Sequence, residues 1–198
     1  MAKELEPRLA EAKEGKRTVY FVDAAHFVFG AFLGYIWSTI RVFVPTPSGR
    51  NRYNVLGAID AITHNLIYVS NDAYINALTV CELLKKIRES HVDSNPITIV
   101  LDNARYQRCS YVTEFAKEQK IELLFLPSYS PNLNIIERFW KWLKKDCLNC
   151  KYYETFAKFK QAIDLSLKKT IDKDNLTELD TLLNLKFQFF DNAIYNRV

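Results

Sequence analysis

The sequence contains few of the residues that interrupt regular structure. Only 5 glycines and 6 prolines occur among 198 residues, which excludes collagen-like and low-complexity chains and favours long helices and strands. Four cysteines are too few for a disulfide scaffold of this length. Hydrophobic residues make up 48% and charged residues 25% of the chain. These fractions exclude a disordered chain and indicate an ordinary globular domain with its own core.

Long apolar runs are also missing. The longest nearly apolar stretch, residues 27–37, has eleven residues, whereas a membrane helix needs about 20. Residues 1–17 are charged and contain no apolar core of a signal peptide. We therefore expect a protein of the cytoplasm without a membrane partner, whose cysteines are reduced.

Neither charge sign dominates the sequence. Lys and Arg number 27 and Asp and Glu number 23, which leaves a formal net charge of +4. This excess indicates a nucleic-acid partner only weakly, because such binding requires the basic groups to gather on one face.

The chain alternates apolar runs with amphipathic stretches. The runs predict strands at residues 18–22, 35–44, 53–60, 96–101 and 121–126. Apolar residues at helical spacing predict helices at 73–89 and 110–120, from 131–134 to about 146, and from 156 onward. Three strands, a helix, a strand, a helix, a strand and further helices predict one α/β domain around a mixed five-stranded sheet.

Carboxylates follow the two most hydrophobic runs. Asp23 comes after Val22 and Asp102 after Leu101, and the ligands of open α/β sheets gather at the carboxyl ends of strands. Glu137 lies beside the apolar stripe of the helix after the last strand. Three carboxylates in one place repel one another unless cations lie between them. The pattern therefore predicts two divalent ions about 4 Å apart, for which Mg²⁺ is suited.

Another interpretation of these acidic residues stays open. An Asp after a strand commonly forms a turn or caps a helix. Asp60, Asp72, Asp93 and Glu114 also lie near the ends of predicted elements, so the periodicity by itself does not exclude them from a site.

Three segments, in order along the chain, resemble the motifs of a known family. The segment LPSYSPNLNIIERFWKWLK, residues 126–144, resembles the C-terminal signature of the DDE superfamily transposases, within them the IS630 group related to Tc1/mariner. Asp102-Asn103-Ala104 resembles the second motif and VDAAH, residues 22–26, the first. Thirty-four residues separate Asp102 from Glu137, a spacing typical of this group. The resemblance covers about residues 18–145.

This resemblance implies a ribonuclease H-like fold and metal-dependent DNA strand cleavage and strand transfer at transposon ends. Asp23, Asp102 and Glu137 match the DDE triad, which in the family binds two Mg²⁺ or Mn²⁺ ions. The implied partner is double-stranded DNA, as transposon ends and as a target at a TA dinucleotide. The active complex is expected to be a dimer on the nucleoid of a prokaryote.

The front of the chain departs from the family. Only 22 residues precede Asp23, fewer than the helix-turn-helix DNA-binding domain that stands there in full-length relatives. We therefore expect that domain to be absent, as in a recombinant fragment, a truncated copy or one product of a split reading frame. The expected parts are an N-terminal arm or short helix (1–17), the catalytic domain (18–146) and a C-terminal helical extension packed on it (147–198). Ile135 and Gln107 replace residues that are Pro and His in many relatives.

Basic and amide side chains near the motifs are candidates for DNA contacts. Lys141 and Lys144 share the helix face of Glu137, and Asn103 adjoins Asp102. A solvated surface or a turn-stabilising amide explains the same residues without DNA. His26 is expected to be a structural histidine that points away from Asp23 if the strand continues. The candidate DNA-binding residues are Arg50, Arg52, Asn103, Arg138, Lys141 and Lys144.

Three functions are compatible with the sequence. The first is a transposase catalytic domain, the second a structure-selective nuclease of the same fold, and the third a non-enzymatic DNA-binding or regulatory remnant of a transposase. The three intact acids argue against the remnant, and the long third motif argues against other nucleases.

Overall fold

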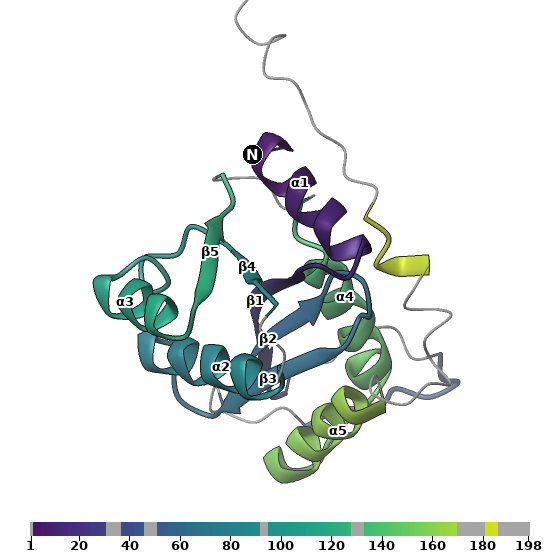
Figure 1. The fold of residues 1–198 in the computed structure, drawn as a ribbon. Helices are drawn as coiled ribbons and strands as arrows, with labels where there is room; N and C mark the ends of the chain where they lie inside the picture. The colour runs from purple at the N-terminus through teal and green to yellow at the C-terminus, as the bar shows by residue number, and fades with distance from the viewer. Residues whose placement is uncertain are drawn as a thin grey trace, which may run out of the picture.

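A mixed five-stranded sheet forms the centre of the computed structural model (Figure 1), which describes residues 2–30, 37–45, 51–91, 95–127, 133–169 and 181–185. The strand order is β3-β2-β1-β4-β5. β2 is antiparallel to both β1 and β3, whereas β4 runs parallel to both β1 and β5. The strands are β1 (Thr18–Val28), β2 (Arg52–Asp60), β3 (Leu66–Asn71), β4 (Ile97–Leu101) and β5 (Ile121–Phe125).

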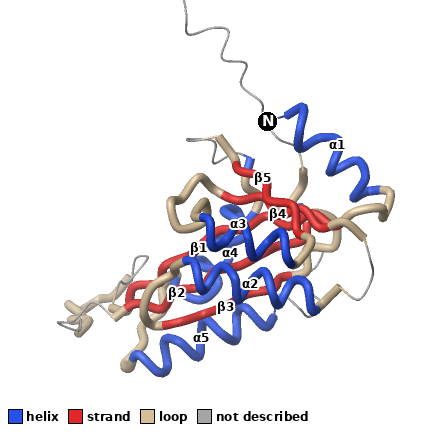
Figure 2. Tube along the Cα trace, turned by 60° about the vertical axis from the view of Figure 1, so that its left-hand side comes forward, coloured by secondary structure: helices blue, strands red, loops and turns tan. Residues whose placement is uncertain are grey.

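Helices cover both faces of this sheet (Figure 2). α2 (Ala77–Glu89) and α3 (Ser110–Glu118) lie on one face, where side chains such as Val22, Leu84 and Val112 form one buried core. α4 (Ile136–Leu148) and α5 (Phe156–Lys169) lie on the other face, where Phe21, Phe139 and Ile163 belong to a second core. The predicted α/β architecture is confirmed by this arrangement.

Residues 2–13 form a helix that packs on the rest of the protein. α1 (Ala2–Lys13) buries Leu5 and Leu9 in the core of the α4 face. The Arg8 and Arg17 guanidinium groups donate to the Glu122 carboxylate on β5, which holds the pKa of Glu122 at about 2. Of the two predicted forms, a short helix or a frayed arm, the structure has the helix.

One predicted strand is wrong and another was missed. Residues 37–45 lie outside the sheet, and Trp37 is 97% exposed; residues 35 and 36 lie outside the described residues. The apolar pattern of this segment predicted a strand wrongly, because no described strand pairs with residues 37–45. The third antiparallel strand is instead β3, which follows a turn in which the Asp60 carboxylate accepts from the amides of Ile62 and Thr63.

β1 is longer than its apolar run. It continues through residue 28 because the whole strand pairs with β2, with Asp23 opposite Gly57 and His26 opposite Asn54. Asp23 therefore lies within a strand, and the prediction that a strand ends there is wrong. β4 does end at Leu101, so Asp102 follows its strand as predicted.

The first helix after β3 begins later than the sequence predicts. The predicted helix 73–89 begins at Ala77, because the Asn76 side chain accepts from the Thr79 amide and closes a capping box.

The described part of the chain contains no helix that is long and apolar enough to cross a membrane.

Candidate active site

The strand register places the first two predicted acids at the same level of the sheet. Phe21 of β1 is paired with Val100 of β4 in a parallel ladder. Asp23 and Asp102 each follow two residues later, so they lie side by side where β4 ends and β1 continues. Along β1, Phe21 and Ala25 belong to the core of the α4 face. Asp23 lies between them on the same face because side chains alternate along a strand.

α4 brings the third acid to this face. Ile136, Phe139, Trp140 and Leu143 are buried against the sheet, which follows from their spacing of three and four residues. Glu137 is half-buried at the margin of this stripe, and Lys141 lies one turn further on at an exposed position. Glu137 and Lys141 share a helix face as predicted, and the positive charge of Lys141 offsets part of the rise that burial causes in the pKa of Glu137.

The three carboxyl groups interact with one another. Burial, together with the negative charges of Asp102 and Glu137, raises the pKa of Asp23 to about 7. Burial also raises the pKa of Asp102, and burial together with the charge of Asp102 raises the pKa of Glu137. The structure thus brings the three acids predicted from the sequence into one electrostatically coupled group.

Within the part of the chain that the structure describes, two buried polar atoms beside the acids have no hydrogen-bond partner. The Asn134 amide donates to the Val22 carbonyl at 3.3 Å and offsets part of the rise in the pKa of Asp102, yet its Oδ1 meets no donor among the described residues. The Trp140 indole N–H offsets a small part of the rise in the pKa of Asp23, but it meets no described acceptor with hydrogen-bond geometry. Orphaned buried groups of this kind are rare and occur at functional sites.

The chemistry of these donors fits a hard divalent cation. Carboxylate and amide oxygens are the ligands that Mg²⁺ takes, and a cation between the acids would remove their mutual repulsion. Nevertheless, in the described ranges no three His, Cys, Asp or Glu side chains stand close enough together to hold a metal ion. The predicted pair of ions stays a prediction.

Gly57 makes room for α4 next to Asp23. A Cβ atom at this position would lie 2.7 Å from Cη2 and 2.9 Å from Cζ2 of Trp140, and 3.3 Å from Cδ1 of Ile136. Because Gly57 is the cross-strand neighbour of Asp23, the absence of a side chain here lets the indole lie against the sheet beside the acid. Gly57 and Trp140 therefore allow α4, which carries Glu137, to pack closely on β2.

We expect Gly57→Ala to destabilise the fold by about 1–3 kcal/mol, the usual cost of overpacking, and, by displacing Glu137, to lower the DNA cleavage that the resemblance implies. Thermal unfolding and a nicking assay measure the two effects. The matched test is the double variant with Trp140→Phe, whose smaller ring leaves space for the new methyl group. If the changes in unfolding free energy of the two single variants simply add in the double variant, the two residues are not in direct contact, since residues in contact are expected to couple.

Sequence reasoning missed one further residue at this site. Burial and the charges of Asp23 and Asp102 raise the pKa of the Tyr106 phenol, so this side chain lies near both acids. No spacing rule singles out a tyrosine four residues after Asp102. Asn134 and Trp140 stood within the recognised motif, but only their burial and orphaned polar atoms indicate a role.

The candidate DNA-binding residues occupy different surroundings. Lys141 is exposed beside Glu137, and the Lys144 ammonium lies 5.8 Å from the Phe27 ring centroid. Asn103 is exposed and accepts from Arg108 at 2.7 Å. Arg138 donates to the carbonyls of Leu182 and Asn184. It thus holds a later segment of the chain.

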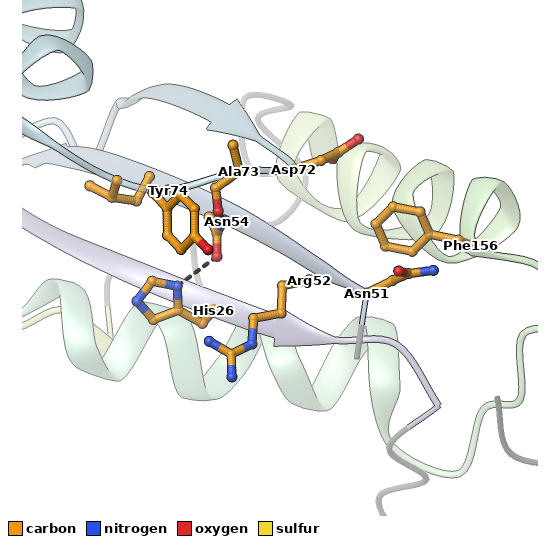
Figure 3. Close-up of a pocket in the computed structure, with 9 residues that line it drawn as sticks. His26, Asn51, Arg52, Asn54, Asp72, Ala73, Tyr74 and Phe156 are labelled. Atoms are coloured by element: carbon orange, nitrogen blue, oxygen red, sulfur yellow. Dashed lines mark hydrogen bonds between the residues drawn. The ribbon is translucent and has the colours of Figure 1, made fainter. Parts of the chain in front are cut away.

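The two remaining candidates come from the loop before β2. Arg50 lies outside the described residues. Arg52 lies away from the acids, in a cleft that His26, Asn54 and Tyr74 also line (Figure 3). The expectation that His26 and Asp23 point to opposite faces is confirmed, since β1 continues past both of them.

The other acids near element ends have structural surroundings. Asp60 accepts from two backbone amides of its turn, as noted above. Asp72 is paired with Lys160 at 2.7 Å, and Glu114 is exposed on α3. Asp93 lies outside the described residues.

A mixed five-stranded sheet flanked by helices is the ribonuclease H-like fold, which this chain shares with transposase and integrase catalytic cores. The chain belongs to the DDE superfamily endonucleases, the family that residues 18–160 match. The resemblance inferred from the three motifs is therefore confirmed.

Individual relatives match parts of this chain. Over 101 residues it is 29% identical to an uncharacterized 39 kDa protein of insertion element IS630 from Shigella sonnei, covering 50% of this chain and 29% of that protein. The Mos1 mariner paired end complex with Mn has a TM-score of 0.58 at 12% identity, over 94% of this chain and 61% of that one. The catalytic core domain of BIV integrase has a TM-score of 0.52 at 15% identity, over 79% and 84%. This chain thus spans about three fifths of the Mos1 chain and less than a third of the IS630 protein.

Proposed function

We propose that this chain is the catalytic domain of a transposase, which cuts DNA at transposon ends and transfers the cut strand to a target. The coupled group of Asp23, Asp102 and Glu137 in a DDE superfamily endonuclease carries this proposal. The Mos1 strand transfer complex and the Mos1 mariner paired end complex with Mn have a similar fold. That similarity supports DNA as the partner.

The proposed reaction has two displacements at phosphorus. In the first, a water oxygen attacks a phosphodiester and the bond between phosphorus and O3′ breaks, which leaves a 3′-hydroxyl and a 5′-phosphate. In the second, the oxygen of that 3′-hydroxyl attacks a target phosphodiester, and a new 3′-hydroxyl leaves. One phosphodiester forms as another breaks, so the transfer needs no external energy source and no covalent protein intermediate.

The residues of the site have separate roles in this proposal. Asp23, Asp102 and Glu137 would hold the divalent cations, which would supply positive charge to offset that of the phosphate oxygens and would activate the attacking water. Lys141 offers a cation to the phosphate beside Glu137. Asn134 ties Asp102 to the backbone of β1. The half-buried Tyr106 and the buried Trp140 line the group of acids.

The test combines cleavage and joining in one tube. The chain is incubated with supercoiled plasmid and a labelled duplex that carries the terminal repeat flanking its gene and ends in a 3′-hydroxyl. A high concentration of the short duplex compensates for weak binding by a separate catalytic domain. We expect nicking of the plasmid and covalent joining of the label with Mg²⁺ or Mn²⁺, and neither product with EDTA.

Two other outcomes identify the alternatives. Metal-dependent nicking without joining would indicate a structure-selective nuclease of the same fold. DNA binding without nicking in either metal would indicate a non-enzymatic remnant. A dimeric active complex and a TA target remain expectations of the transposase assignment. Size measurement of the joined complex and sequencing of the insertion sites test them.

A further inference from the structure

A polar cleft lies beyond the acids, on the part of the β1–β2 pair that extends past β4 and β5 (Figure 3). Its volume is about 520 Å³, a size that suits a small ligand or one unit of a polymer. His26 of β1 and Arg52 and Asn54 of β2 form its floor, and Tyr74, before α2, forms part of a wall. None of these four residues belongs to the group of acids.

The strand register explains why these side chains share one face. His26 is paired with Asn54, and Val28 with Arg52. Residues two apart on a strand point to the same side, so the imidazole and the guanidinium are diagonal neighbours within reach of one ligand. Figure 3 shows both groups on the same side of the two strands.

Asn54 fixes the orientation of the imidazole. The amide is 2% exposed, and its Nδ2 donates to the Ala73 carbonyl at 2.8 Å and to Asn71 at 3.3 Å. Its Oδ1 therefore faces His26 Nδ1 at 2.7 Å as an acceptor, so Nδ1 carries the hydrogen. The hydrogen-bond network assigns this tautomer, which directs Nε2 away from Asn54. His26 is thus exposed but held in place.

The charge of the cleft is positive. Across the described ranges, no carboxylate forms an ion pair with Arg52, whose side chain is exposed. Asp72, the one acid that lines the cleft within the described ranges, is paired with Lys160 at 2.7 Å. A planar guanidinium without a carboxylate partner is well suited to bind two oxygens of a phosphate.

Hydrogen bonds between residues close in the sequence hold the wall of the cleft in place. The Ala73 amide donates to Asn71, and Asn71 donates to the Tyr74 carbonyl at 3.2 Å. The Tyr74 side chain is nevertheless 81% exposed. An exposed aromatic ring beside a phosphate-binding arginine is the combination by which proteins hold one nucleotide of a strand.

We propose that this cleft binds the sugar-phosphate backbone of a DNA strand, with Arg52 and His26 on one phosphate and Tyr74 against the adjoining nucleoside. The inference rests on the proposed function because it takes DNA as the partner. His26 lies three residues after Asp23 and on the opposite face of β1, so the cleft is a separate binding surface and not an extension of the group of acids.

The experiment measures DNA binding without metal. The full chain is titrated with a fluorescein-labelled single strand and with a duplex, at several KCl concentrations in EDTA. Loss of one phosphate contact lowers the salt slope of log K against log[KCl] by about 0.7 for the single strand and about 0.9 for the duplex. We expect Arg52→Ala to show this loss for at least one of the two probes, together with a fivefold to tenfold lower affinity. His26→Ala and Tyr74→Ala should weaken the same probe.

The matched control is Lys16→Ala, which removes the same charge from an exposed residue at the opposite end of β1. It should leave the slope unchanged, and thermal unfolding confirms that all variants are folded. Equal slopes and affinities for Arg52→Ala and Lys16→Ala would overturn the proposal, as would a wild-type chain that binds neither probe. Strand joining by Arg52→Ala with an unchanged salt slope would reject the cleft and keep the transposase assignment. A reduced salt slope for Arg52→Ala, in a protein whose wild type never cleaves DNA, would support the cleft and reject the transposase assignment.

Discussion

Asp23→Asn, Asp102→Asn and Glu137→Gln are each expected to lower metal-dependent DNA cleavage by at least about a thousandfold. Each change keeps the shape of the side chain but removes a negative oxygen from the coupled group. A bound metal contributes several kcal/mol to phosphoryl transfer, and about 4 kcal/mol corresponds to a thousandfold in rate at 1.36 kcal/mol per factor of ten. Nicking of supercoiled plasmid in Mg²⁺ or Mn²⁺ measures the loss.

The matched control is Glu114→Gln, which alters an exposed acid on α3 and should cleave like the wild type. Circular dichroism and thermal unfolding show whether each variant keeps its fold. Near-normal cleavage by any one of the three variants would remove that residue from the catalytic set. Equal losses in all three, with an intact fold, would agree with a shared metal site.

In the absence of metal, the protein is expected to lose stability as the pH rises from about 4 to 7, and Asp23→Asn is expected to lose less. The pKa of Asp23 is about 7 in the folded protein against 3.8 for an unperturbed Asp. Between these values the folded state holds a proton that the unfolded state has released, so stability falls with rising pH. This pKa difference corresponds to up to about 4 kcal/mol at 1.36 kcal/mol per pH unit.

Denaturant unfolding in EDTA, at intervals from pH 4 to pH 8, measures this effect. The curves of the wild type and Asp23→Asn should meet near pH 4 and separate above it, with the variant the more stable at pH 8. Burial raises the pKa of Asp102 and Glu137 as well, so the variant keeps part of the decline. Added Mg²⁺ should stabilise the wild type at pH 8 more than the variant. Parallel curves for the two proteins would mean that burial and the acidic neighbours do not raise the pKa of Asp23.

The two sets of measurements separate the function of the acids from their effect on folding. Acids that serve only the fold would be expected to stabilise it, and their replacement would destabilise the protein. A site that holds negative charges together for a cation shows the opposite behaviour, because the repulsion persists until the cation binds. Asp23→Asn is thus expected to be more stable and inactive, a combination that a structural acid does not produce.

Local patterns by themselves determined much of this protein. The apolar runs before Asp102 and Pro127 are strands, and the helical spacing at 80–87, 139–143 and 156–167 gives α2, α4 and α5. These predictions succeeded because continuous or periodic burial of neighbouring residues leaves a direct trace in the sequence. The motif around Glu137 indicated the family because it is one uninterrupted segment that can be read directly in the sequence.

Contacts between distant residues were decided only by the tertiary structure. β1 extends past Asp23 because β2 pairs with it, and residues 37–45 are not a strand because none pairs with them. Tyr106 reaches the acids, Arg138 turns to the backbone of Leu182, and Arg52 meets His26 in a cleft. Each of these outcomes depends on strand register and helix packing between segments tens of residues apart, whose energies no local periodicity records.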